Sequence, residues 1–170
     1  MAAATRPHPG LMADNPLSKI PTLVLDDGTV LYDSPVVCEY LDSLHAGGKL
    51  IPAELGPRMT ALRRQALGDG MLDVLLLLRN ERERAHVSGA HVSAFTIKTA
   101  AVLDAFEREA DALAASAFDI GHIGVGGALC YLDFRFAGED WRKHHPRIAR
   151  WHASFCARPS VRATEPVDDS

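Results

Sequence analysis

The sequence lacks the features of several large classes of protein. Its longest apolar run, Met71 to Leu78, is interrupted by Asp73 and is far too short to cross a bilayer. The stretch from Met1 to Met12 has no apolar core, so it does not resemble a signal peptide. The 18 Lys and Arg residues are scattered among 22 acidic ones, for a formal net charge of −4. This pattern argues against nucleic acid or an anionic membrane as the main partner.

Cysteine is also scarce. Cys38, Cys130 and Cys156 are far apart in the sequence, and an odd, dispersed set indicates a reducing compartment without a disulfide framework. We therefore expect a cytoplasmic protein in which the cysteines are small core residues. The absence of a C-x-x-C motif argues against a thiol–disulfide oxidoreductase.

Metal and phosphate sites are not predicted either. Among the eight histidines, His86 and His91 are five apart and His144 and His145 are adjacent, and neither spacing puts two ligands on one helical face. Four glycines between Gly121 and Gly127 superficially resemble a phosphate loop. No strand precedes them and no Lys-Ser/Thr follows, so we expect them to permit close helix packing.

What the sequence does contain begins with a hairpin and a helix. Residues 22–25 and 29–32 are rich in Val, Leu, Thr and Tyr, and Asp27-Gly28 between them predicts a two-residue turn in which Gly28 has a positive φ. Ser34 then predicts a helix cap, with Pro35 at the first helical position. Because residues 5–15 are rich in proline and glycine, we expect neither strand nor helix there.

The rest of the chain predicts a helical bundle after a linker over residues 47–57. Apolar residues at helical spacing predict four helices. Their expected buried stripes include Met59, Ala66, Met71 and Leu78 in the first, Phe95, Phe106 and Leu113 in the second, most of residues 122–136 in the third, and Ile148, Trp151 and Phe155 in the fourth. Gly89 marks the first break, and Ser93 is the expected cap of the second helix.

Both parts resemble one family. NPLSKIPTLVLDDGTVLYDSPVVCEYLD, residues 15–42, is similar to the second half of the thioredoxin-like domain of cytosolic glutathione S-transferases. ALCYLDFRF and HPRIARWHASFCARPSVRATEP resemble the central and closing helices of that family. The family caps its central helix with Ser or Thr and an acidic residue three positions later. Here Asp119 and His122 occupy those positions, so we expect a weaker helix start.

The resemblance implies a mostly α protein with two domains. Residues 1–46 would form a partial thioredoxin-like domain, a hairpin plus a helix, and residues 57–170 an all-α carboxy-terminal bundle. The first strand, first helix and second strand of the family's thioredoxin-like domain should precede Asn15. Only a short tail does, so we expect a truncated amino-terminal domain.

The same resemblance implies a glutathione site. In a cis Ile20-Pro21 bend, the Ile20 backbone would pair with the cysteinyl part of glutathione as an added strand does. The start of the following helix would hold the γ-glutamyl end, through Ser34 for the carboxylate and Asp33 for the ammonium group. Lys19 would reach the other carboxylate. The simpler alternatives are a trans Pro21 at a strand start, a plain helix cap and a solvated lysine.

The family joins the glutathione thiol to hydrophobic electrophiles, without a metal and usually as a homodimer. Its thiolate-stabilising Tyr, Ser or Cys follows the first strand, a segment that has no match here, so we assign no catalytic residue. The hydrophobic substrate would lie against the first long helix. The alternative is a non-catalytic relative, either a glutathione-binding module or a dimer scaffold.

An uncovered two-stranded hairpin is marginal in water, and its edge invites pairing with other chains. We therefore predict that the 170-residue chain either associates or is cleaved by protease within residues 1–45. Size-exclusion chromatography and limited proteolysis with mass spectrometry test this. A monomer that is uniformly resistant to protease would contradict it.

Overall fold

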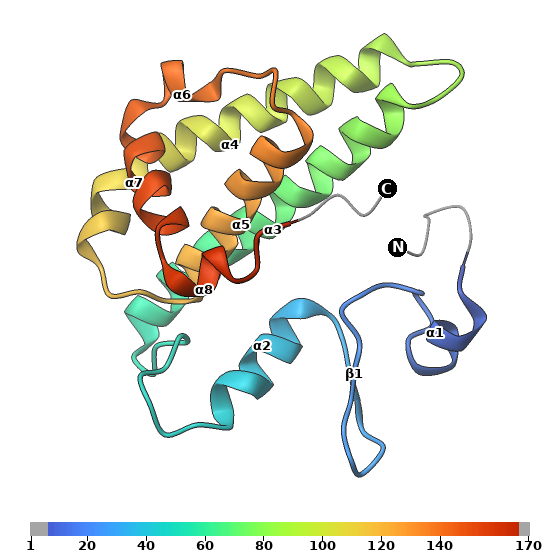
Figure 1. Cartoon of the computed structure of the whole chain (residues 1–170), viewed down its shortest axis with the longest axis vertical. Helices are drawn as coiled ribbons and strands as arrows, with labels where there is room; N and C mark the ends of the chain where they lie inside the picture. Colours follow the sequence, from blue (N-terminus) through green and yellow to red (C-terminus); the bar gives the residue numbers. More distant parts are fainter. Residues whose placement is uncertain (1–6, 167–170) are drawn as a thin grey trace. The chain divides into compact units, whose positions relative to one another are not determined.

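The computed structural model describes residues 7–166, and these divide into two compact units between Ile51 and Pro52 (Figure 1). The first contains α1 (Pro9–Asp14), β1 (Leu23–Val24), β2 (Val30–Leu31) and α2 (Ser34–Ser43). The second contains α3 (Leu55–Arg82), α4 (Gly89–Ala115), α5 (Ile120–Arg135), α6 (Trp141–His144), α7 (Pro146–Cys156) and α8 (Pro159–Arg162). The predicted fold class is confirmed, because a hairpin and helix precede a helical bundle. No helix within the described residues is long and apolar enough to cross a membrane.

The hairpin has a longer loop than the sequence predicted. The antiparallel pairs are Leu23 with Leu31 and Val24 with Val30. The Leu25 N–H donates to the Thr29 carbonyl and the Gly28 N–H to the Leu25 carbonyl, both at 2.9 Å. The loop therefore comprises the three residues 26–28 instead of the predicted Asp27-Gly28 pair. Gly28 has the predicted positive φ, 85°, as expected for the residue that completes a three-residue hairpin loop.

The segment before the hairpin forms α1, so the prediction that it would be irregular was wrong. Pro9 is in the first turn, where the missing N–H of proline has no intrahelical partner to lose. His8 caps the helix, because its Nδ1 accepts a hydrogen bond from the Leu11 N–H at 3.2 Å. Proline content therefore marked the start of a short helix and did not exclude one.

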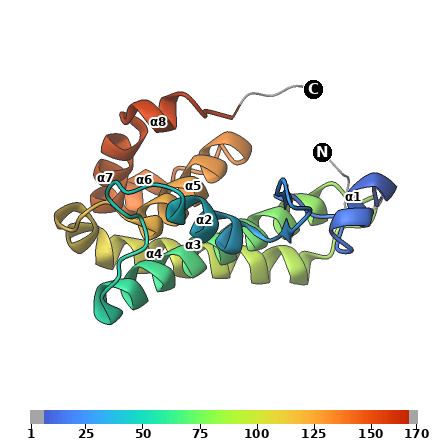
Figure 2. The same ribbon diagram turned by 90° about the horizontal axis from the view of Figure 1, so that it is seen from below.

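In the helical unit, α3 and α4 are the two long helices and lie side by side (Figures 1 and 2). α5 packs on α3, and α7 packs on both α4 and α5. The core they enclose is one hydrophobic cluster, in which the largest fully buried side chains are Met71, Leu75, Leu78, Val125, Leu129, Leu132 and Ile148. The inward positions predicted for Ile148, Trp151 and Phe155 are confirmed.

Two details of the long helices differ from the prediction. Met59 is 49% exposed and Ala66 is also exposed, because the buried stripe of α3 includes Gln65 and Gly68 instead. The first two helices do separate just before Gly89, at residues 83–88, but Ser88, not the expected Ser93, is the cap of α4 and accepts from the His91 N–H. The spacing of large apolar residues does not predict that small or polar residues such as Gly68 and Gln65 are buried in a contact between helices.

Glycines set the distance between α3 and α5. A Cβ on Gly68 would lie 2.3 Å from the Gly124 carbonyl oxygen, and a Cβ on Gly124 would lie 2.7 Å from the Gln65 Cα. Both contacts are with backbone, which cannot move unless a whole helix moves. The expectation that these glycines permit close packing is confirmed at this contact. Gly127, by contrast, has nothing within 4 Å of its Cβ position.

The start of α5 is capped by an unusual pair. The Asp119 side chain accepts from the His122 N–H at 3.2 Å, and the His122 Nδ1 lies 3.1 Å from the Asp119 N–H. The His122 Nε2 lies 2.9 Å from the Leu113 carbonyl oxygen, where α4 ends. Both bonds of a capping box are thus present although no Glu or Gln is. That this start is weaker than the family's remains a prediction.

We predict opposite effects for alanine at two glycines of α5. Gly124→Ala should lower the free energy of unfolding by about 1–3 kcal/mol or more, because α3 and α5 must separate to admit the methyl group. Gly127→Ala should leave it unchanged or raise it by up to about 1 kcal/mol, because alanine favours helix and space is open. Urea denaturation of both variants measures the difference. Equal stabilities would contradict the close contact.

Candidate functional site: an exposed bend and a helix start

Asn15 holds the bend that precedes β1. It is fully buried, and its Nδ2 donates to the Lys19 carbonyl and to the Thr22 Oγ1, both at 3.0 Å. Its Oδ1 accepts from the Leu17 N–H at 3.0 Å. The Thr22 hydroxyl also donates to the Lys19 carbonyl at 2.8 Å. One buried amide therefore fixes both ends of the segment that carries three predicted site residues, Lys19, Ile20 and Pro21.

The Ile20 backbone is available to a ligand. The Ile20–Pro21 peptide is cis, and the Ile20 residue is 69% exposed. Within residues 7–166, the structure records no hydrogen bond to the Ile20 N–H or carbonyl. Both polar groups are thus free to pair with an extended peptide.

α2 begins one residue earlier than predicted. Asp33 is the cap, through its backbone carbonyl, which accepts from the N–H groups of Val36 and Val37 at 3.1 Å. Ser34 is the first helical residue and Pro35 the second, so the prediction of Ser34 as the cap was wrong. The Asp33 side chain makes no capping bond and is exposed, while Ser34 is half-buried. The Ser34 N–H and hydroxyl lie at the positive end of the helix dipole.

The hairpin brings these two features to the same end. Leu23 and Leu31 form the last pair of the hairpin at this end; the bend leads directly into Leu23, and α2 begins three residues after Leu31. Lys19, like Ile20 and Asp33, is exposed. All five predicted site residues therefore surround the open end of one hairpin. An acceptor and donor pair, an anion-binding helix start, a carboxylate and an ammonium group suit a peptide with two carboxylates and one amine.

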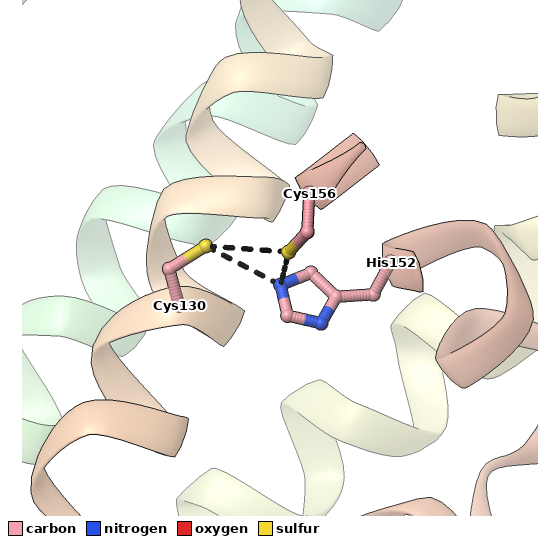
Figure 3. A group of neighbouring side chains, drawn as sticks. All are labelled: Cys130, His152 and Cys156. Atoms are coloured by element: carbon pink, nitrogen blue, oxygen red, sulfur yellow. Dashed lines mark hydrogen bonds between the residues drawn. The ribbon is translucent and has the colours of Figure 1, made fainter. Parts of the chain in front are cut away.

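The helical unit contains a second cluster of chemically competent groups, drawn in Figure 3. Cys130 on α5 and Cys156 on α7 have their sulfur atoms 3.9 Å apart. The His152 Nε2 lies 3.4 Å from the Cys130 Sγ and 3.3 Å from the Cys156 Sγ. Both thiols are free and half-buried, and both pack against the hydrophobic core, as expected of small core residues. These three atoms could hold a metal ion.

Burial shifts the pKa of two groups in this cluster, the Cys130 thiol and the His152 ring. Burial raises the pKa of the Cys130 thiol to about 12, and the neighbouring Cys156 adds to this effect. Burial also lowers the pKa of His152. A thiol with a raised pKa is a poor nucleophile, which argues against a catalytic cysteine here.

Asp133 lies on the other side of the His152 ring. Its Oδ2 is 3.7 Å from the His152 Nδ1. Burial raises the pKa of the Asp133 carboxyl, but hydrogen bonds from Arg142 and Trp141 outweigh it, so this pKa lies below its ordinary value. The Trp141 Nε1 and the Arg142 Nη1 both donate to the Oδ1 at 2.8 Å. A charged carboxylate therefore faces the Nδ1 and leaves the Nε2 for the sulfurs.

Two of the three residues of this cluster could have been recognised from the sequence. His152 and Cys156 are four residues apart, a spacing that puts two side chains on one face of a helix. The sequence analysis compared the spacing of histidines only, so it missed the pair of His152 with Cys156. Cys130 could not be recognised in this way, because it is 22 residues from His152. Only the packing of α5 on α7 brings the third group in.

A cavity of about 340 Å³ also lies in the helical unit, between α4 and α7. Phe118, Trp151 and Phe155 line it, with Arg150 and Arg158 among the polar residues. None of the five predicted site residues contributes to it.

Comparison with known proteins identifies the family of this chain. Residues 2–44 match the glutathione S-transferase N-terminal domain and residues 89–154 the C-terminal domain. A glutathione transferase family member from Pseudomonas fluorescens Pf-5, solved with bound glutathione, is 40% identical, with a TM-score of 0.94 over 99% of this chain and 83% of that one. The chain belongs to the glutathione S-transferase family.

Other members agree with this assignment. A glutathione S-transferase from Methylobacillus flagellatus KT, solved with GSH bound, is 32% identical, with a TM-score of 0.89 over 94% of this chain and 83% of that one. The uncharacterized GST-like protein YibF of Escherichia coli K12 is 27% identical over 161 residues, which are 92% of this chain and 80% of that protein. The predicted family resemblance is confirmed.

We predict that Asn15→Ala loosens the bend of this transferase-family chain. Removing the buried amide leaves the Leu17 N–H without its acceptor and should cost the amino-terminal unit about 1–3 kcal/mol. Hydrogen exchange of the amides of residues 17–24 should accelerate accordingly. Asn80→Ala, at an exposed position of α3, is the matched control and should change neither the stability of the amino-terminal unit nor these exchange rates. Unchanged exchange in the Asn15 variant would show that this amide does not hold the bend.

Proposed function

We propose that the protein is a glutathione transferase that joins the glutathione thiol to small hydrophobic electrophiles. Residues 1–46 form the glutathione-binding domain and residues 57–170 the helical domain. The electrophile rests against the exposed apolar side chains of α3. The enzyme acts as a cytoplasmic homodimer, and the proposed conjugation needs no metal.

One observation carries the proposal: an exposed, unpaired peptide backbone at Ile20 precedes β1, and the start of α2 follows β2, at the same end of the antiparallel hairpin. The Ile20 N–H and carbonyl pair with the cysteinyl backbone of glutathione beside Pro21, as a strand adds to a sheet edge. The Ser34 N–H and hydroxyl bind the γ-glutamyl carboxylate at the positive end of α2. Relatives solved with bound glutathione support this choice of ligand.

The two remaining groups complete recognition by charge. Asp33 is exposed beside Ser34 and accepts from the γ-glutamyl ammonium group. Lys19 pairs with the glycyl carboxylate. Each contact is at the surface, so neither is expected to be worth more than about 1 kcal/mol. Affinity rests mainly on the backbone pairing and on Ser34.

Transfer of the thiol to an electrophile requires that the thiol lose its proton. Glutathione must be bound as the thiolate, because the thiol itself is a weak nucleophile. The five site residues bind and orient the peptide, and none of them is assigned the role of thiolate stabiliser. We therefore assign no catalytic residue. Glutathione binding without conjugation is the alternative function.

We predict that calorimetric titration of glutathione gives saturable binding that Ser34→Ala weakens roughly 10- to 100-fold, the effect of losing one hydrogen bond to a charged group. Ser43→Ala, at the other end of α2, should bind as the unchanged protein does. A conjugation assay with a chloronitrobenzene then separates the two functions. Conjugation supports the transferase, and binding without conjugation supports the non-catalytic alternative. Absence of binding, or equal binding by both variants, would contradict the site.

A further inference from the structure

We propose that Cys130, His152 and Cys156 form a site for Zn²⁺ in the helical unit, one that joins α5 to α7 (Figure 3). The site is separate from the glutathione-binding residues, and the proposal does not depend on the proposed function. It replaces the expectation, drawn from histidine spacing alone, that the chain has no metal site.

The distances suit a tetrahedral cation. Zinc lies about 2.3 Å from sulfur and about 2.0 Å from nitrogen, so in a tetrahedral site two sulfurs lie about 3.8 Å apart and each lies about 3.5 Å from the nitrogen. The sulfurs of Cys130 and Cys156 are 3.9 Å apart, and the His152 Nε2 lies 3.4 Å and 3.3 Å from them. All three edges of the triangle agree to within about 0.2 Å of those that zinc requires.

The chemistry of the donors favours the same ion. When Zn²⁺ binds, the Cys130 and Cys156 thiols release their two protons to solvent, because zinc is bound by thiolates. Two thiolates and a neutral imidazole are ligands that zinc prefers, and their two negative charges neutralise Zn²⁺. A complex without net charge suits a partly buried site. Two of the ligands, His152 and Cys156, are four residues apart on α7, a spacing by which one helix can supply two ligands to zinc.

The surroundings of His152 resemble those of a metal ligand. Its ring is 2% exposed and its Nδ1 faces the carboxylate of Asp133 at 3.7 Å. In zinc sites a carboxylate commonly takes the second N–H of a ligating histidine and fixes the orientation of the ring. Asp133 is in turn held by Trp141 and Arg142. At 3.7 Å Asp133 acts on the ring through its charge and not through a hydrogen bond, so its proposed role is to position His152 and not to bind the ion.

The two cysteines of the site are partly exposed to solvent. Cys130 and Cys156 are both half-buried, so an ion can reach them from solvent. Three protein ligands leave one position of a tetrahedral ion open, which water fills. Within the described residues, no further His, Cys, Asp or Glu joins this group of ligand atoms.

The experiment uses the full-length protein, reduced and freed of metal by dialysis against a chelator. Titration with Zn²⁺ against a chromogenic chelator should show one ion per chain. Titration with Co²⁺ should show the near-ultraviolet thiolate-to-cobalt band and the visible bands of a tetrahedral centre. Zn²⁺ should also raise the temperature of unfolding, because it binds the folded chain at a preformed site.

Variants identify the ligands. Cys130→Ser and Cys156→Ser should each weaken Zn²⁺ binding by more than about 100-fold, and Asp133→Asn by about 10- to 100-fold, as other outer carboxylates do. Cys38→Ser, in the other unit, is the matched control and should bind as the unchanged protein does. Circular dichroism confirms that each variant is folded.

Three outcomes would overturn the proposal. The first is the absence of stoichiometric Zn²⁺ binding by the reduced protein. The second is a Co²⁺ spectrum without the thiolate band, which needs no variant and so holds even if a variant fails to fold. The third is a Cys130–Cys156 disulfide, seen by mass spectrometry, in protein that takes up no zinc after reduction.

Discussion

The close approach of α3 and α5 is the constraint on which the helical unit depends. Gly68 and Gly124 bring the two backbones so near that a Cβ on either would overlap the other helix. Because α5 packs so close to α3, its first turn also contacts the end of α4, where the His122 Nε2 lies within hydrogen-bond distance of the Leu113 carbonyl oxygen. Another face of α5 packs against α7. Two residues without side chains thereby position four helices.

The amino-terminal unit is organised by a polar group instead of an apolar core. Few of its residues are buried, and one of them is the amide of Asn15. Burying an amide is favourable only when its hydrogen bonds are made, so its partners at Lys19, Thr22 and Leu17 are held in one arrangement. These hydrogen bonds hold the chain on both sides of the exposed Ile20 backbone.

Local chemistry made much of the fold predictable. Gly28 has the positive φ that its hairpin needs, and the apolar stripe of α7 is buried as its spacing indicated. The errors arose where a non-local or polar contact decided the outcome. His8 supplied a cap that made α1 possible, and Gln65 with Gly68 took places in the α3 contact that periodicity gave to larger apolar residues. The five residues predicted to bind glutathione came from family resemblance, because no spacing rule alone distinguishes Ser34 from an ordinary helix start.

The cysteine–histidine cluster shows why such a site escapes sequence analysis. A Cβ on Gly126 would lie 2.3 Å from the Phe155 ring, so the missing side chain lets α7 approach α5 at that level. Cys130 is one helical turn beyond Gly126, and Cys156 directly follows Phe155. The packing contact that the glycine permits is therefore also the contact that sets the two sulfurs 3.9 Å apart. Helical spacing reveals the pair of His152 and Cys156. The position of Cys130 beside them depends on Gly126, a residue that has no ligand atom and that no search for metal ligands would select.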